Sequence, residues 1–314
     1  MSPSRIMRKS IFTFLQNFQQ LSSAPSLLLL PFAASILLSP PLVASSRLFP
    51  LIHGRLRSVF LAAGIPPQSE LFAILNLKLA QTILSFAFSL PFSLSFLLLA
   101  KAAVIRLLHR HKPNSFLSLI STLNRLVATH ICNSLLILSA NATCFCLLAA
   151  AFNCADVLSL SSPRFRLLLS ATGAIAYSIV LANAYIVCGI ALIASAVDAD
   201  GGGGLSSILE ACALIRGRTS AALSLAVPMN MALAAVEALF QYRIFNAYSR
   251  ETAVTPPMVL EAAIIAYIYA MVLILDTIVG YVLLKSLREE QTHFNPQRID
   301  FFRQVKELES VVSI

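Results

Sequence analysis

Charged residues are scarce in this chain. Asp, Glu, Lys and Arg together make up 12% of its 314 residues, about half of the roughly 25% that is usual in a soluble domain. Acidic residues are the scarcer sign, because 14 Asp and Glu stand against 23 Lys and Arg, and none precedes Glu70. Hydrophobic residues make up 58%, more than a soluble core of this size can bury. The composition therefore excludes an ordinary water-soluble domain and indicates lipid as the surrounding medium.

The sequence also lacks the motifs of common catalytic sites. It contains no HExxH, GxSxG, GxGxxG or P-loop sequence, and no nucleophile stands at a recognisable spacing from a base. The six cysteines lie in or beside apolar segments, without the CxxC pairs and histidines of a zinc site. Basic residues are not interleaved with aromatic ones as in a nucleic-acid-binding surface. We therefore expect a non-enzymatic protein without a cofactor, a metal or a nucleic-acid partner.

Six apolar runs are long enough to cross a bilayer, whose hydrocarbon core needs about 20 helical residues. The third and fourth runs exceed that length, so we expect them to tilt or to extend beyond the core. The sequence predicts one all-α domain, a polytopic transmembrane helical bundle. Its expected spans are Ser26–Ser46, 79–100, 126–155, 167–197, Thr219–Tyr242 and Ala262–Leu284.

Amphipathic segments flank the predicted bundle. We divide the chain into an N-terminal amphipathic cytosolic helix (1–25), the six-span bundle (26–284) and a cytosolic amphipathic tail (285–314). Asn295 followed by Pro296 is a good helix start within that tail. In the N-terminal helix, helical spacing predicts an apolar face that lies in the membrane interface. That face comprises Met7, Ile11, Phe14, Leu15 and Phe18.

The distribution of basic residues predicts the orientation. Of the Lys and Arg residues, 15 lie on the side that holds both termini and 8 on the other, which favours cytosolic termini. Arg216 and Arg218 fall on the cytosolic side as interface anchors, and Gly217 lets the chain turn into the fifth span. Upstream, DADGGGG (198–204) reads as a flexible linker. The segment 205–215 then predicts a short interfacial helix with Ile208, Leu209, Cys212 and Ile215 on one side.

Two other interpretations of the N-terminus stay open. The absence of acidic residues before Glu70 and the many Ser and Arg residues are also typical of an organelle transit peptide. A cleaved signal peptide is a further alternative, with LVASS (42–46) after the apolar stretch. A retained first span, in an endomembrane or the plasma membrane, is the interpretation we prefer.

Asp276 is the main candidate for intramembrane chemistry. It lies nine residues before Lys285, which at about 1.5 Å per residue places it roughly 13 Å deep. A carboxylate at that depth indicates a proton or cation site, or a hydrogen bond to a neighbouring helix. The candidate polar site comprises Asp276, Asn183, Asn230 and Glu237, with Tyr267 as a further possible partner of Asp276.

Small residues predict close helix contacts. Ala174, Ser178 and Ala182 are spaced by four, with Gly173 alongside, a pattern that allows helices to approach one another. We expect membrane lipids as partners, and other membrane proteins through such small-residue faces or through the C-terminal helix. The favoured function is a scaffold or a lipid- or protein-binding component. The alternative is a transporter or channel-like carrier that uses Asp276.

Four stretches of the chain carry a resemblance to a known family. They are LLLLPF (27–32), NSFLSLISTLNRL (114–126), EACALIRGRTSAALSL (210–225) and LLKSLREEQTHFNPQRID (283–300). Together with the N-terminal amphipathic helix, they resemble a plant family of six-span integral membrane proteins. The resemblance implies this topology and a plant source but no particular reaction. In that family an acidic residue and a glycine usually precede the LIRGR helix, whereas here DADGGGG stands in that place.

Overall fold

The computed structural model describes residues 3–62, 70–109, 116–157, 162–198, 203–245 and 256–294, and these residues are helical with no strand. The short helices are α1 (Pro3–Gln16), α2 (Phe18–Leu21), α4 (Leu48–Ala62), α6 (Leu98–His109) and α9 (Leu205–Ile215), with π-helical turns η1 (Ser93–Leu97) and η2 (Gln241–Phe245). The long helices are α3 (Ala24–Ser45), α5 (Glu70–Phe92), α7 (Phe116–Val157), α8 (Pro163–Val197), α10 (Thr219–Phe240) and α12 (Pro256–Phe294).

Six segments of the described chain are long and apolar enough to cross a membrane. They follow the order predicted from the sequence, so the all-α, membrane-embedded fold class is confirmed. The segments are Ala24–Val43, Asn76–His109, Ile120–Ala155, Leu167–Val197, Thr219–Phe245 and Pro256–Glu290.

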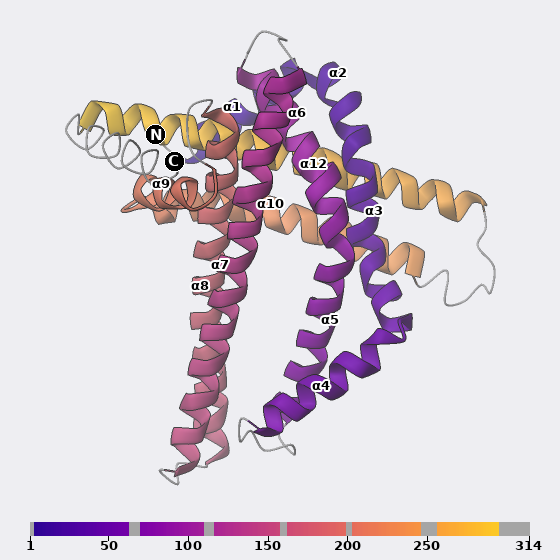
Figure 1. Ribbon diagram of the computed structural model, residues 1–314, viewed down its shortest axis with the longest axis vertical. Coiled ribbons are helices and arrows are strands. Elements are labelled where there is room, and N and C mark those ends of the chain that lie inside the picture. Colours follow the sequence, from indigo (N-terminus) through magenta and orange to yellow (C-terminus); the bar gives the residue numbers. More distant parts are fainter. Residues whose placement is uncertain are drawn as a thin grey trace.

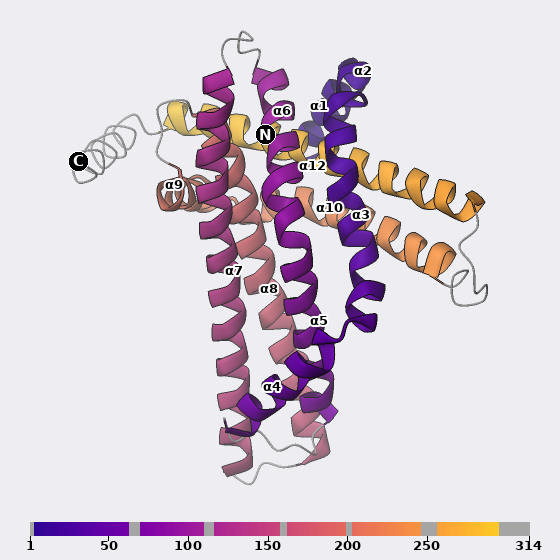
Figure 2. The ribbon, with the colours of Figure 1, turned by 45° about the vertical axis from the view of Figure 1, so that its right-hand side comes forward.

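The long helices follow two directions. Figures 1 and 2 show α7 and α8 as an extended hairpin, with α3 and α5 running roughly alongside it, while α10 and α12 cross this set steeply. The 42 residues of α7 reach about 63 Å at 1.5 Å per residue, twice the thickness of a bilayer core of about 30 Å. A bilayer normal parallel to α7 therefore leaves α10 and α12 strongly inclined.

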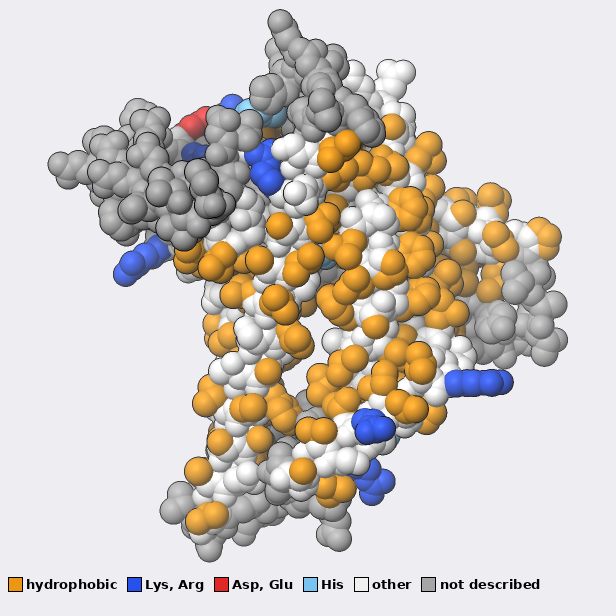
Figure 3. Space-filling model, viewed as in Figure 1, with side chains coloured by type: hydrophobic (Ala, Val, Ile, Leu, Met, Phe, Trp, Pro, Cys, Tyr) orange, Lys and Arg blue, Asp and Glu red, His pale blue; other side chains and the backbone are white. Residues whose placement is uncertain are grey.

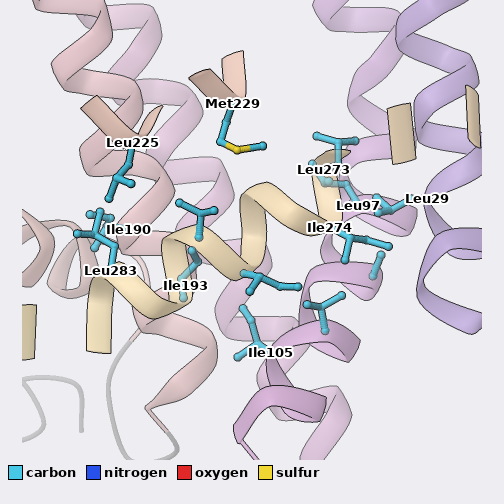
Figure 4. Close-up of a cluster of buried hydrophobic side chains, with 14 of the residues drawn as sticks. Leu29, Leu97, Ile105, Ile190, Ile193, Leu225, Met229, Leu273, Ile274 and Leu283 are labelled. Atoms are coloured by element: carbon cyan, nitrogen blue, oxygen red, sulfur yellow. The ribbon is translucent and has the colours of Figure 1, made fainter. Parts of the chain in front are cut away.

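The core lies where α10 and α12 cross the other helices. Figure 4 shows Leu29 of α3, Ile105 of α6, Ile193 of α8 and Met229 of α10 around α12, and Ile274 of α12 is fully buried among them. Lipid tails are as apolar as these side chains, so close van der Waals packing, rather than exclusion from water, holds such helices together.

Prolines and a π-helical turn shape the helices. Pro31, Pro40 and Pro41 lie inside α3, Pro91 inside α5 and Pro228 inside α10. Each proline lacks the N–H that would bond the preceding turn, so hydroxyl groups and local winding changes satisfy the freed carbonyls. The hydroxyl of Ser39 donates at 3.0 Å to the Ile36 carbonyl, which Pro40 leaves without its helical partner, and the π-helical turn η1 follows directly after the end of α5.

The flanking segments are joined to the bundle. Helix α12 continues without a break from Pro256 to Phe294, past the predicted end of the last span at Leu284. At the other terminus, α1 packs on α12 through buried Ile6 and Ser10. The predicted helix start at Asn295–Pro296 lies outside the described residues.

Candidate functional site in the helix bundle

Asp276 and Lys101 form a pair of opposite charges inside the apolar segments. Asp276 lies on α12 and Lys101 on α6, both half-buried, and their charges attract one another electrostatically. Helix α6 continues for eight residues past Lys101 to His109. Lys101 therefore lies within the span Asn76–His109. The predicted range 79–100 had placed it just outside the end of that span.

His130 of α7 and Ser93 of η1 lie beside this pair. The Ser93 hydroxyl and the His130 Nε2 atom are 3.3 Å apart, and His130 also interacts electrostatically with Lys101. The Ser93 hydroxyl donates to the Leu90 carbonyl at 2.9 Å. A π-helical turn often marks a functional site, and η1 here turns Ser93 toward α7.

Glu237 of α10 contacts α12 at Tyr269. Its Oε1 atom accepts a hydrogen bond of 2.9 Å from the hydroxyl of Tyr269. Tyr269 is seven residues before Asp276, on the same face of the helix, and the two interact electrostatically. Glu237 thus reaches the helix that carries Asp276 through its hydrogen bond with Tyr269.

The two asparagines of the predicted site are exposed on their own helices. Asn183 is exposed on α8. Asn230 is exposed on α10 and donates from its Nδ2 atom to the Ala226 carbonyl of its own helix at 3.0 Å. Their grouping with Asp276 stays a prediction, because sequence distance from a span boundary gives depth but not the direction in which a side chain faces.

A second charged site lies where α8, α9 and α12 meet. We call it the Arg288 cluster, and it comprises Arg288, Asp198 and Glu210. Arg288 donates from Nη1 to Asp198 Oδ1 at 3.1 Å and from Nη2 to Asp198 Oδ2 at 2.8 Å. Its Nη2 atom also donates to Glu210 Oε1 at 2.8 Å. Such a two-pronged contact is the geometry that a guanidinium group favours with a carboxylate.

The link between α8 and α9 is tied to α7 at its described ends. Arg125 donates to the Asp198 carbonyl at 2.5 Å, and the Gly204 amide donates to the Thr129 hydroxyl at 2.8 Å. A Cβ atom on Gly203 would lie 3.0 Å from both the Cα and the carbonyl oxygen of Arg125. The prediction of a flexible linker is therefore wrong for these ends, while residues 199–202 lie outside the described residues.

The two arginines of the turn before α10, Arg216 and Arg218, have different surroundings. Gly217 has a φ of +85°, a conformation that favours glycine, as its predicted turn requires. Arg218 is half-buried and forms a salt bridge with Glu290 of α12. Arg216 is exposed. Of the two predicted interface anchors, Arg218 thus pins α10 to α12, and Arg216 is the one that faces outward.

Helices α1 and α9 each carry an apolar outer stripe. The α1 outer stripe comprises Ile11 and Leu15 of α1 and Phe18 at the start of α2, which are 42%, 63% and 46% exposed, while Met7 and Phe14 pack toward the core. The α9 outer stripe comprises Leu205, Leu209 and Cys212, all exposed. The prediction that Leu209 and Cys212 share a face with Ile208 and Ile215 was wrong, because Ala211 and Leu214 complete the buried face.

The outer surface of the bundle is mainly apolar on the face that is drawn in Figure 3. Figure 3 shows apolar side chains over the vertical helices, with Lys and Arg side chains toward the two ends of this face. Within the described ranges, no group of three or more His, Cys, Asp or Glu side chains is placed to hold a metal ion. The bundle thus offers charge pairs and hydrogen bonds as its polar chemistry.

Comparison with known proteins gives a family and nothing more. A family model described as Domain of unknown function (DUF8558) matches residues 4–295, which is most of the chain. No curated protein and no solved structure matches the chain significantly.

Proposed function

We propose that the chain, which belongs to the DUF8558 family, is a non-enzymatic multi-pass membrane protein that binds lipids or a membrane-associated protein. The single observation that carries this proposal is the pair of outer stripes on α1 and α9. Each helix has one face packed on the bundle and a second apolar face that nothing in the described chain covers.

The position of these helices supports the same function. Figures 1 and 2 place α1 and α9 in the same half of the molecule, beside the ends of α6 and α12. A short helix with an exposed apolar stripe beside transmembrane ends is suited to lie in a membrane interface. The Arg288 cluster keeps α9 fixed against α8 and α12, so its stripe is presented in one direction.

A photo-crosslinking experiment in native membranes tests this function. A benzophenone amino acid replaces Leu15 or Leu209, both exposed in the outer stripes, and a matched control replaces Glu289, which is exposed at the end of α12. We expect lipid adducts or adducts to one defined protein from the first two positions and few from Glu289. Equal yields from all three positions, or none from Leu15 and Leu209, would contradict the proposal.

The topology is part of the proposal. Six crossings with both termini in the cytosol agree with the excess of basic residues on one side and place Arg216 on the cytosolic face. An endomembrane or the plasma membrane is the expected location, and an organelle reached through a transit peptide is the alternative. Microscopy of a C-terminally tagged chain distinguishes these locations.

A carrier is the second candidate function, and the Asp276–Lys101 pair favours it. Opposite charges within membrane spans are rare and mark ion or proton pathways. His130, Ser93 and the Glu237–Tyr269 contact extend this polar region across four helices. Proton flux in proteoliposomes tests it: Asp276→Asn abolishes flux in correctly folded protein if the pair carries protons, whereas misassembly of this variant indicates a structural role, and the exposed Asn230→Ala control leaves flux unchanged.

A further inference from the structure

Helix α1 carries three cations on its exposed side. Arg5, Arg8 and Lys9 are all exposed, and with Phe12 they follow the i, i+3, i+4, i+7 spacing that brings residues onto one helical face. These four residues line an open hollow of about 350 Å³. Phe12, whose side chain is 66% exposed, forms the apolar part of its wall.

Within the described residues, the three cations of this hollow have no carboxylate partner. No Asp or Glu occurs in the sequence before Glu70, so α1 has no acidic neighbour along its own chain. The N-terminal end of the helix adds its partial positive charge to the same region.

The hollow adjoins the α1 outer stripe. Leu15 follows Phe12 by three residues and Arg8 by seven, so the cations border Ile11 and Leu15 on the surface of α1. On the far side, Ile6 and Ser10 are buried against the bundle. Around its axis, helix α1 thus presents three neighbouring faces: one packed on the bundle, one apolar and exposed, and one basic.

We propose that the hollow lined by Arg5, Arg8, Lys9 and Phe12 binds the phosphate of an anionic lipid headgroup. This inference rests on the proposed lipid-binding function and names the lipid class. Basic side chains attract anionic headgroups, while a neighbouring apolar stripe enters the upper part of the acyl region. An acidic soluble partner would satisfy the cations but would leave Phe12 and Leu15 exposed to water.

The test is a titration of the full chain in dodecyl maltoside micelles. The probe is short-chain phosphatidylserine with a fluorescent acyl chain, compared with the matching phosphatidylcholine and with inorganic phosphate as competitor. The variant combines Arg5→Gln, Arg8→Gln and Lys9→Gln. The matched control combines Arg47→Gln, Arg55→Gln and Arg57→Gln, which removes the same charge from three exposed arginines in and beside α4.

We expect the α1 variant to lose affinity for phosphatidylserine on the order of 100-fold, from about fivefold per cation. The α4 control and the charge-conserving variant with Arg5→Lys, Arg8→Lys and Lys9→Arg keep their affinity within about twofold, a range that corresponds to less than 1 kcal/mol. Because the three α1 side chains are exposed, the melting temperature of the α1 variant should match that of the unmodified chain.

Specific outcomes overturn the inference. Equal loss in the α1 variant and the α4 control would mean that net charge alone attracts the lipid. Competition by inorganic phosphate at the same concentration as the lipid would identify a free-anion site instead of a headgroup site. If the unmodified chain binds both lipids alike while crosslinking at Leu15 succeeds, the lipid-binding function stands and the anionic preference fails. Absence of both signals removes the function itself.

Discussion

Arg288 and Asp198 are joined by two hydrogen bonds, of 3.1 and 2.8 Å, across 90 residues of sequence. The contact connects the end of α8 to the last turns of α12, and Arg288 also reaches Glu210 on α9. One guanidinium group therefore fixes three helices at the end of the bundle where the chain leaves its apolar segments.

Loss of the Arg288 side chain should destabilise the protein. Arg288→Gln removes the two-pronged contact and leaves two carboxylates near one another. The three side chains are 26–32% exposed, so we expect a loss of about 1–2 kcal/mol in the free energy of unfolding, the lower part of the range for charged hydrogen bonds. Denaturation in mixtures of sodium dodecyl sulfate and mild detergent, followed by circular dichroism, measures it.

The Arg243–Glu261 pair provides the control for this prediction. Arg243 Nε lies 2.6 Å from Glu261 Oε1, but the two side chains are 57% and 39% exposed. We expect Arg243→Gln to change the free energy of unfolding by less than about 0.5 kcal/mol. Equal losses for Arg243→Gln and Arg288→Gln would show that the Arg288 cluster contributes no more than an ordinary surface pair.

Gly280 permits close contact between α12 and α8. A Cβ atom added there would lie 2.4 Å from Ile193 Cδ1, and Ile193 is only 4% exposed. Gly280→Ala should therefore lower the free energy of unfolding by about 1–2 kcal/mol through overpacking. Ile193→Val removes the clashing Cδ1 atom, so the double variant should be more stable than the sum of the two single losses implies, by at least about 0.5 kcal/mol.

Gly189 on α8 is the matched position for the alanine substitution. Nothing lies within 4 Å of a Cβ atom built there, so Gly189→Ala should be neutral or slightly stabilising through its better helix propensity. The same denaturation assay measures all four variants. Additive effects of Gly280→Ala and Ile193→Val would refute the close contact.

The Asp276–Lys101 pair should show strong coupling. Asp276→Asn leaves Lys101 as a charge without its counter-charge inside an apolar segment, and Lys101→Gln does the same to Asp276. Each single substitution should lower the free energy of unfolding by about 2 kcal/mol or more. The double substitution should be less damaging than either single one, because no lone charge remains. A double variant as damaged as the sum of the singles would show that the two charges act independently.

The sequence predicted the spans because their signal is local. About 20 consecutive apolar residues define a crossing without knowledge of any neighbour, and Gly217 sits at the positive φ that its predicted turn needs. The helix at 205–215 was also predicted from the local sequence, although two residues of its predicted face proved to be exposed. These features depend on residues within a few turns of one another, which a single sequence displays.

The partners of the polar residues depend on helix rotation and on contacts distant in sequence. Asp276 interacts electrostatically with Lys101 across 175 positions of sequence, and an isolated pattern cannot indicate which face of α12 turns toward α6. The grouping of Asn183 and Asn230 with Asp276 rested on depth alone, and both side chains are exposed on their helices. One signal in the sequence could have predicted that Lys101 lies inside the span. The mostly apolar stretch AAVIRLL (102–108) that follows it continues the helix beyond this first basic residue.

Whether the segment 219–245 crosses the membrane can be tested at the two arginines near its ends, Arg216 and Arg243. Helix α10 and the turn η2 cover residues 219–245, about 40 Å at 1.5 Å per residue, which is enough to cross a core of about 30 Å. Arg216 precedes this segment and Arg243 lies near its end, and both are exposed. If the segment crosses the membrane, the two positions lie on opposite faces, despite the steep angle to α7 that Figure 1 shows.

Cysteine labelling distinguishes a crossing from a helix in the membrane plane. In a variant with all six native cysteines replaced, Arg216→Cys should react with a membrane-impermeant maleimide only after permeabilisation lets the reagent reach the cytosolic face. Arg243→Cys and Arg57→Cys should react in intact cells or sealed lumen-out vesicles. Labelling of Arg216→Cys and Arg243→Cys from the same face would mean that α10 and α12 lie along the membrane, leaving four crossings. Reaction of Arg216→Cys from outside alone would instead invert the orientation and place the basic face of α1 on the opposite leaflet.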